Sequence, residues 1–194
     1  MNEKALLTYL RAKLSPSRYE HSLGVAQTAR ELAERFGADP QKAYAAGLAH
    51  DLSKWMEPDE MLKYAAARAL PVDEYERCDP KLLHAKISAS LLKEEFGESD
   101  EGVLNAVRRH IAGSPGMSLL DAVVCLADWI EPGRRYADVP KLRETAKLSL
   151  EMALRDALAA TMRVLLEKKK AIHPQSLESY NAIVWMIERK EVFK

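Results

Sequence analysis

Apolar residues recur with a helical period along nearly the whole chain. Leu6, Leu7 and Leu10 fall on one face of a first segment, and Leu158, Met162 and Leu165 repeat the spacing far downstream. Residues three and four positions apart share a helix face, whereas a half-buried strand would alternate apolar and polar residues. Because nothing in the sequence alternates in this way, the pattern predicts an all-α protein.

Prolines, glycines and capping residues divide this pattern into helices. Ser15 and Asp39 each precede a proline, a combination typical of a helix start, and Gly37 follows an apolar run as a helix stop does. We expect one domain over residues 1–194, since no repeat or linker divides the chain. The expected helices span about 2–13, 15–36, 40–54, 58–70, 81–96, 100–112, 117–130, 140–168 and 174–190, with a loop at 71–80.

Composition excludes several classes of function. Lysine plus arginine and aspartate plus glutamate each number 29, so the net charge is zero and no broad basic face for nucleic acid is expected. Cys78 and Cys125 form no CxxC pair, which argues against a disulfide scaffold or a thiolate zinc site. The most apolar run, Leu119 to Ile130, contains two aspartates and is too short to span a bilayer. With no signal-peptide core at the start, a cytoplasmic protein without a membrane partner is expected.

A histidine and an aspartate, His50-Asp51, follow each other at the end of an apolar run. An imidazole and a carboxylate are both metal ligands, and burying them is costly unless something satisfies them. His21 lies on an apolar stripe of an earlier helix, and Asp128 lies in an otherwise apolar later helix. We therefore predict a metal site formed by His21, His50, Asp51 and Asp128. Without thiolates, this ligand set suits iron, manganese, cobalt, nickel or zinc, and the residues alone do not choose among them.

Further histidines and cations accompany the predicted ligands. His84 and His110 lie on inward faces of two more helices. Arg18 precedes His21 by one turn, Lys54 follows Asp51 by one turn, and Arg134 follows Asp128 after a turn. Positive charge around a metal is what a phosphate-rich substrate requires.

These residues resemble the HD-domain superfamily of metal-dependent phosphohydrolases. The order of His21, the His50-Asp51 doublet and Asp128 carries the resemblance. The YqeK branch is indicated by Arg18-x-x-His21, His50-Asp51-x-x-Lys54, and the run from Ala127 to Arg134. Likeness to that branch extends over about residues 15–185. The family usually has two threonines where this chain has Ile111 and Ala112.

The resemblance implies an HD-domain helical bundle with a metal site in its core. It implies symmetrical hydrolysis of diadenosine tetraphosphate to two ADP, with iron as the metal. Catalytic roles are expected for Asp51, Lys54, His84 and His110, as water holder, phosphate ligand and proton donors. One metal ion is favoured. In the alternative, His84 and His110 would bind a second metal ion. The residues expected to bind substrate are Arg18, Lys54, His84, Arg109, His110, Ile111, Arg134, Ile172, His173, Pro174, Gln175 and Ser176.

Other interpretations stay open at this point. The chain could be an HD-type phosphatase or phosphodiesterase with another nucleotide substrate. It could instead bind metal and nucleotide without catalysis and regulate a partner, or be a helical scaffold without a metal. A homodimer is compatible with the sequence.

Overall fold

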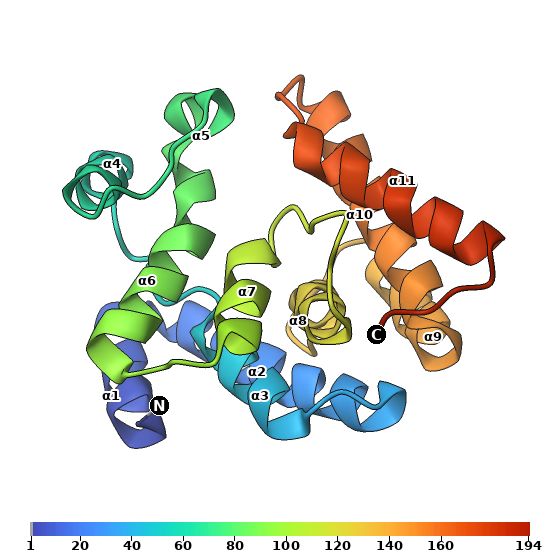
Figure 1. Ribbon diagram of the computed structural model, residues 1–194, viewed down its shortest axis with the longest axis horizontal. Coiled ribbons are helices and arrows are strands. Elements are labelled where there is room, and N and C mark those ends of the chain that lie inside the picture. The colour runs from blue at the N-terminus through green and yellow to red at the C-terminus, as the bar shows by residue number, and fades with distance from the viewer. Residues whose placement is uncertain (1) are drawn as a thin grey trace.

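The computed structural model describes residues 2–194 and contains only helices and connecting segments within that range. The expectation of an all-α protein is confirmed, and Figure 1 shows the arrangement. The helices are α1 (Glu3–Lys13), α2 (Pro16–Phe36), α3 (Pro40–Ala49), α4 (Pro58–Ala67), α5 (Glu74–Cys78), the 3-10 helix η1 (Pro80–Leu83), α6 (His84–Phe96), α7 (Glu101–Arg109), α8 (Leu119–Ile130), α9 (Val139–Leu148), α10 (Leu150–Glu167) and α11 (Pro174–Glu188).

The capping signals read from the sequence begin and end helices as expected. The Ser15 hydroxyl accepts a hydrogen bond from the backbone N–H of Arg18, which caps α2. Asp39 caps α3 in the same way, through the N–H groups of Gln41 and Lys42. Gly37 ends α2 with φ of 85°, a left-handed conformation that glycine adopts without steric cost. Each N-terminal cap contributes about 1 kcal/mol to stability.

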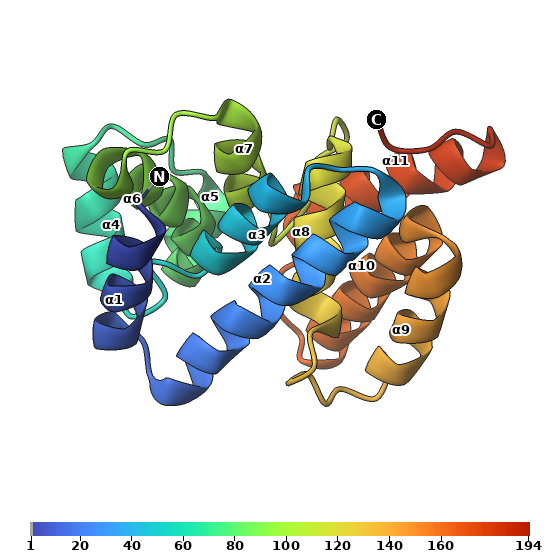
Figure 2. The same cartoon turned by 90° about the horizontal axis from the view of Figure 1, so that it is seen from below.

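Helix α8 forms the centre of the fold. It packs against α2, α3 and α7 on one side and against α10 on the other, as Figure 2 shows. Most of its side chains are buried, so its apolar composition is explained by contact with helices on several sides. Gly47 of α3 lies directly against Ala26 of α2, since a β-carbon there would be 2.9 Å from the Ala26 Cα. This close contact brings the end of α3 to the middle of α2.

The expectation of a single helix over residues 140–168 is wrong. The chain forms α9 and α10, separated at Ser149, whose φ of −154° and ψ of 129° are those of extended backbone. The Ser149 hydroxyl accepts a hydrogen bond from the Met152 N–H and caps α10. The chain reverses here, so that α9 packs against α10, and the apolar positions on both sides of Ser149 belong to different helices.

Four smaller expectations also need correction. The expected loop at 71–80 contains α5, because Asp73 and Glu76 form a reciprocal capping box. The helix expected to end near Lys54 ends at Ala49, and residues 50–56 continue as tight turns with hydrogen bonds three residues apart. Residues 80–83, expected partly as α-helix, form the 3-10 helix η1, and α8 begins at Leu119 after the cap at Ser118.

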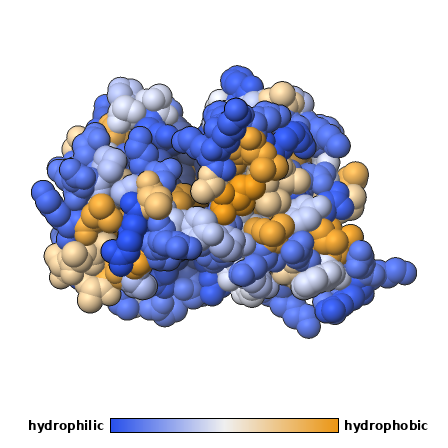
Figure 3. Space-filling model, turned by 90° about the horizontal axis from the view of Figure 1, so that it is seen from above, coloured by the Kyte–Doolittle hydropathy of each residue, from blue (hydrophilic) through white to orange (hydrophobic). Residues whose placement is uncertain are grey.

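Among residues 2–194, no helix has both the length and the apolar character needed to cross a lipid bilayer. Figure 3 shows a mainly hydrophilic surface with a hollow at its upper edge and apolar side chains beside it.

Candidate metal centre and phosphate site

Four of the predicted metal ligands converge beside α8. His21 comes from α2, His50 and Asp51 follow the last residue of α3, and Asp128 comes from α8. Nε2 of His21 lies 3.0 Å from an oxygen of Asp128 and 3.2 Å from Nε2 of His50. An Asp51 oxygen lies 3.6 Å from Nε2 of His50. Residues more than a hundred positions apart in the chain thus form one compact cluster.

His84 and His110 extend this cluster through Asp51. His84 is the first residue of α6, and His110 directly follows α7. Nε2 of His84 lies 3.2 Å from the second oxygen of Asp51 and 3.2 Å from Nε2 of His110. All six predicted residues are therefore brought together, and five are almost fully buried, the side chain of Asp128 being 19% exposed.

Hydrogen bonds to Nδ1 fix the orientation of the four imidazoles. Carbonyl oxygens only accept hydrogen bonds, so a ring nitrogen facing one carries the proton and leaves the lone pair on Nε2. The ring of His21 has a side-chain partner, since its Nδ1 donates to a carboxylate oxygen of Glu131 at 3.0 Å. The other three rings donate to backbone carbonyls. The backbone acceptors are Gly47 for His50 at 2.7 Å, Lys81 for His84 at 2.5 Å and Val107 for His110 at 2.7 Å.

This arrangement fits a divalent transition metal. The Nε2 lone pairs of His21 and His50 face each other across 3.2 Å, an arrangement that two neutral imidazoles avoid unless a cation lies between them. Three overlapping groups have ligand atoms within 4.8 Å of one another: His21 with His50 and Asp51, His50 with His110 and Asp128, and Asp51 with His84 and His110. Nitrogen and oxygen ligands of this kind match the predicted metal class.

The electrostatics of the cluster keep its carboxylates ionised and the imidazoles of His50 and His110 neutral. Burial alone would raise the pKa of Asp51, but His50, His84 and Lys54 hold it well below its usual range. Burial would likewise raise the pKa of Asp128, but the contact with His21 and the charges of His50, Arg134 and His110 together hold it well below its usual range. Burial lowers the pKa of His110 to about 3, helped by the neighbouring histidines. Deprotonated carboxylates and neutral imidazoles are the forms that bind metals.

Three cations surround the cluster, each next to one of its carboxylates. A guanidinium nitrogen of Arg18 lies 2.9 Å from Asp51. The guanidinium of Arg134 donates to the carboxylate of Asp128 and, at 2.6 Å, to its backbone carbonyl. Nζ of Lys54 lies 2.9 Å from Nε2 of His84 and 3.6 Å from Asp51. Positive charge is therefore placed where an anionic group bound beside the cluster would lie.

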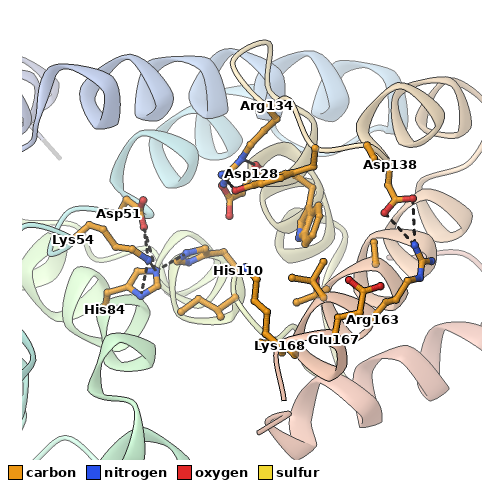
Figure 4. A pocket seen from close by; sticks show the side chains of 18 of the residues that line it. Asp51, Lys54, His84, His110, Asp128, Arg134, Asp138, Arg163, Glu167 and Lys168 are labelled. Atoms are coloured by element: carbon orange, nitrogen blue, oxygen red, sulfur yellow. Dashed lines mark hydrogen bonds and ion pairs between the residues drawn. The ribbon is translucent and has the colours of Figure 1, made fainter. Parts of the chain in front are cut away.

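The cluster forms one end of a cavity of about 760 Å³. Figure 4 shows Lys54, His84 and His110 on one side of this cavity, Asp128 and Arg134 at a second, and Asp138 with Arg163 at the far end. Arg18 and Ile111, both predicted to bind substrate, also line it. A cavity of this size accommodates a nucleotide-sized ligand.

Arg109 lies apart from this cavity. Its guanidinium forms an ion pair with the buried Asp121 at 2.7 Å and donates to the carbonyl of Gly116. Consecutive residues at the end of a helix point to different sides, so the side chain of Arg109 does not follow that of His110. Arg109 therefore stabilises the start of α8 in this structure and does not line the cavity.

Residues 172–176 comprise the two residues before α11 and the first turn of this helix, and they do not line the cavity either. Nε2 of His173 lies 2.9 Å from a carboxylate oxygen of Asp73, before α5. The Gln175 side chain donates to the carbonyl of Gly113 at 2.7 Å, close to Ile111. Ser176 is buried in the first turn of α11, Pro174 begins this helix, and Ile172 precedes it. These contacts tie α11 to the segments after α7 and before α5.

Sequence reasoning gave no role to Glu131, whose carboxylate holds the ring of His21. Its side chain is 5% exposed and accepts a further hydrogen bond from the N–H of Gly133. Gly24 and Gly133 leave room for it, since a β-carbon at either position would lie within 2.9 Å of its carboxylate oxygens. The signal was present in the sequence, because Glu131 follows Asp128 by one helical turn.

Comparison with known proteins agrees with this geometry. The HD domain model matches residues 18–133. A Bacillus subtilis protein named "Bis(5'-nucleosyl)-tetraphosphatase, symmetrical" is 39% identical, over 95% of this chain and 98% of its own length. A Staphylococcus aureus protein of the same name is 30% identical, over 97% and 98%.

A solved structure shows the same fold. It is the crystal structure of a Clostridium acetobutylicum protein described as an HD superfamily hydrolase involved in NAD metabolism. The two chains superpose with a TM-score of 0.92 at 33% identity, over 95% of this chain and 98% of the other. The helices, the His-Asp cluster and these similarities lead to one assignment: the chain belongs to the HD-domain family.

Proposed function

We propose that this protein hydrolyses diadenosine tetraphosphate symmetrically, giving two ADP. The observation that carries the proposal is the His-Asp cluster, flanked by Arg18, Lys54 and Arg134, at one end of a cavity large enough for a nucleotide. The names of the Bacillus subtilis and Staphylococcus aureus relatives support the choice of substrate. In the reaction, a water oxygen bonds to one of the two central phosphorus atoms. The bond from that phosphorus to the central bridging oxygen breaks, and this oxygen leaves with the second ADP.

His21, His50, Asp51 and Asp128 would hold one divalent metal, for which we propose iron. Such an ion lowers the pKa of a bound water and so supplies a hydroxide near neutral pH. We favour one ion over two because the Lys54 ammonium lies against both His84 and Asp51, at the position a second ion would take. Two cations at this position would repel each other.

The remaining polar residues act on the phosphate chain. Arg18 and Arg134 each hold a metal-binding carboxylate while presenting further N–H donors to the cavity, and Lys54 adds a third cation. In phosphoryl transfer, positioning and charge stabilisation supply most of the catalysis. Asp51 would accept a proton from the attacking water and pass it to Nε2 of His84, which lies 3.2 Å from its carboxylate. His84, or His110 beyond it, would then deliver this proton from Nε2 to the leaving phosphate. The buried position of both histidines keeps that proton away from solvent.

The nucleoside of one half would bind at residues 172–176. Hydrogen bonds from His173 to Asp73 and from Gln175 to Gly113 fix this segment next to Ile111, a residue of the cavity wall. A fixed segment supplies backbone groups for hydrogen bonds to a base at low entropic cost. Of the residues predicted to bind substrate, Arg109 is the one that we no longer propose.

Location and assembly are further parts of the proposal. Cys78 and Cys125 are unpaired, which suits a reducing cytoplasm. Leu177 and Trp185 are exposed apolar side chains on α11 and would suit a homodimer contact. Sedimentation equilibrium of the wild type and of Trp185→Ser tests the dimer, which a monomeric wild type would rule out.

A substrate panel tests the proposed function. Purified protein loaded with iron(II) without oxygen is incubated with diadenosine tetraphosphate, nucleoside triphosphates and cyclic nucleotides. Turnover of the tetraphosphate that disappears in Asp51→Ala supports the proposal. Turnover of triphosphates or cyclic nucleotides alone would identify another nucleotide hydrolase. Nucleotide binding without any turnover would identify a binding protein.

A further inference from the structure

The cavity continues beyond the metal-binding cluster along α10, past Arg134 (Figure 4). Its walls change character along this path. Cations and imidazoles surround the cluster end, whereas the far part is lined mainly by Trp129, Tyr136, Ala137, Ala160, Val164 and Leu165. None of the roles proposed above uses these six residues.

The far part has the composition of a site for a flat heterocycle. Tyr136 is 57% exposed and Val164 39% exposed, so both offer apolar surface to a ligand. The rings of Trp129 and Tyr136 lie with their centroids 6.1 Å apart, tilted by 53°. Asp138 and Arg163 form a 3.2 Å ion pair at the rim. Apolar and aromatic walls with a polar rim are typical of small-molecule sites, and aromatic faces stack on nucleobases.

Arg134 connects this part of the cavity to the cluster. Its guanidinium donates to the carboxylate of Asp128 and lies 5.6 Å from the centre of the Tyr136 ring. A phosphate bound by Arg134 would therefore have its attached nucleoside within reach of Tyr136. The side chain of Arg134 alone therefore reaches from the cluster to the aromatic wall.

Residues 172–176 do not line the far part of the cavity, so they cannot serve both ends of a symmetrical substrate. Their partners are Asp73 and Gly113, while the far part is formed by α10 and the segment from Trp129 to Asp138. Resting on the proposed function, we propose that this far part binds the nucleoside of the second half of the dinucleotide. Two separate nucleoside sites would then place the central phosphates at the cluster and make the cleavage symmetrical.

Two substrates and three variants test this site. Diadenosine tetraphosphate needs both nucleoside sites, whereas adenosine 5'-tetraphosphate carries one nucleoside and needs only one. Val164→Trp fills the far part, and Tyr136→Ala removes its aromatic wall. Leu166→Trp is the matched control, because Leu166 is 66% exposed on the same helix and does not line the cavity.

Val164→Trp and Tyr136→Ala should raise KM for diadenosine tetraphosphate by about tenfold, the loss expected for one base-stacking contact. Their kcat and their KM for adenosine 5'-tetraphosphate should stay within about twofold of the wild type, as should all constants of Leu166→Trp. Fluorescence quenching by each nucleotide gives the affinities independently of turnover.

Unchanged KM and affinity for the dinucleotide in both variants would overturn the second site. An equal rise for both substrates would also overturn it, since the cavity would then hold the single nucleoside site. Failure of the proposed function looks different, because the wild type itself would then not turn over diadenosine tetraphosphate. In that case, equal quenching affinities of wild type and both variants for the dinucleotide would overturn the second site as well. Two variants guard against one that fails to fold.

Discussion

The carboxylate of Glu131 lies 3.0 Å from Nδ1 of His21 and directs Nε2 of that ring at the metal-binding cluster. Partners of this kind raise the basicity of a metal-binding histidine and fix its orientation. Gly24 and Gly133 leave the space that the Glu131 side chain occupies. The sequence around Asp128 thus encodes a metal ligand together with the support of a second one.

Glu131→Ala should lower metal affinity by about 10- to 100-fold, because the His21 ring loses its fixed orientation. Glu131→Gln should lose less, since its amide oxygen can still accept the hydrogen bond. Metal content after dialysis against a graded chelator measures both. Glu151→Gln is the matched control. Glu151 is a buried glutamate that accepts hydrogen bonds from the Ser149 hydroxyl and the Phe193 N–H, outside the cluster. Wild-type metal retention by Glu131→Ala would contradict the orienting role.

Metal removal should destabilise the fold around the cluster. An ion that binds only the folded state contributes about 2.7 kcal/mol at one hundred times its Kd, which corresponds to a fall of roughly 5–10 °C in Tm when it is removed. Scanning calorimetry of the chelated protein, with and without added iron(II) or manganese(II), checks this shift. Asp128→Asn should show little metal-dependent shift, because it removes a ligand. A wild-type Tm that is the same with and without added metal would contradict the metal site.

Arg18→Ala should lower kcat/KM for diadenosine tetraphosphate by about 10- to 100-fold while leaving metal content unchanged. Arg18 contacts Asp51 from the cavity side, so its loss removes a phosphate partner and leaves every metal ligand in place. Arg35→Ala on the same helix is the control, since Arg35 lies at the far end of α2 and donates to the backbone carbonyl of Lys147. Equal kinetics for both variants would remove Arg18 from the phosphate site.

Acid should weaken the contact between residues 172–176 and the start of α5. Burial would raise the pKa of Asp73, but the Glu76 N–H and the His173 side chain lower it below its usual value. A carboxylate with a lowered folded-state pKa contributes stability above its unfolded pKa and loses it as pH falls through the folded value.

The stability difference between wild type and Asp73→Asn should therefore be present at pH 6 and shrink below about pH 4. It should be no more than about 1 kcal/mol, because the side chain is 41% exposed. Urea unfolding of the metal-free protein at several pH values measures it. A difference that grows in acid would contradict this sign.

The sequence predicted the cluster better than the helices that carry it. His21, His50, Asp51, His84, His110 and Asp128 were recognised because a buried group of ionisable residues is costly without a partner. Helix boundaries were less accurate at Ser149, where an apolar period continues across a reversal of the chain. Local periodicity does not reveal that two helices fold back on each other, since that depends on contacts with α8.

Residue direction was the other limit. Arg109 and His110 are neighbours in the sequence, yet the arginine pairs with Asp121 and the histidine faces the cluster. Val164 and Arg163 gave no signal of a site shared with Tyr136, because these residues meet only when α10 packs beside the segment after α8. Side-chain chemistry was readable from the sequence, whereas the shape of the cavity depended on tertiary packing.

Product analysis tests the central claim most directly. The iron-loaded protein is incubated with diadenosine tetraphosphate in water enriched in oxygen-18. The nucleotides are then separated, and their oxygen-18 content is measured by mass spectrometry. ADP as the only nucleotide product, with one label for every two molecules, is the predicted result. AMP together with ATP would contradict symmetrical cleavage and the arrangement of nucleoside sites on both sides of the cluster.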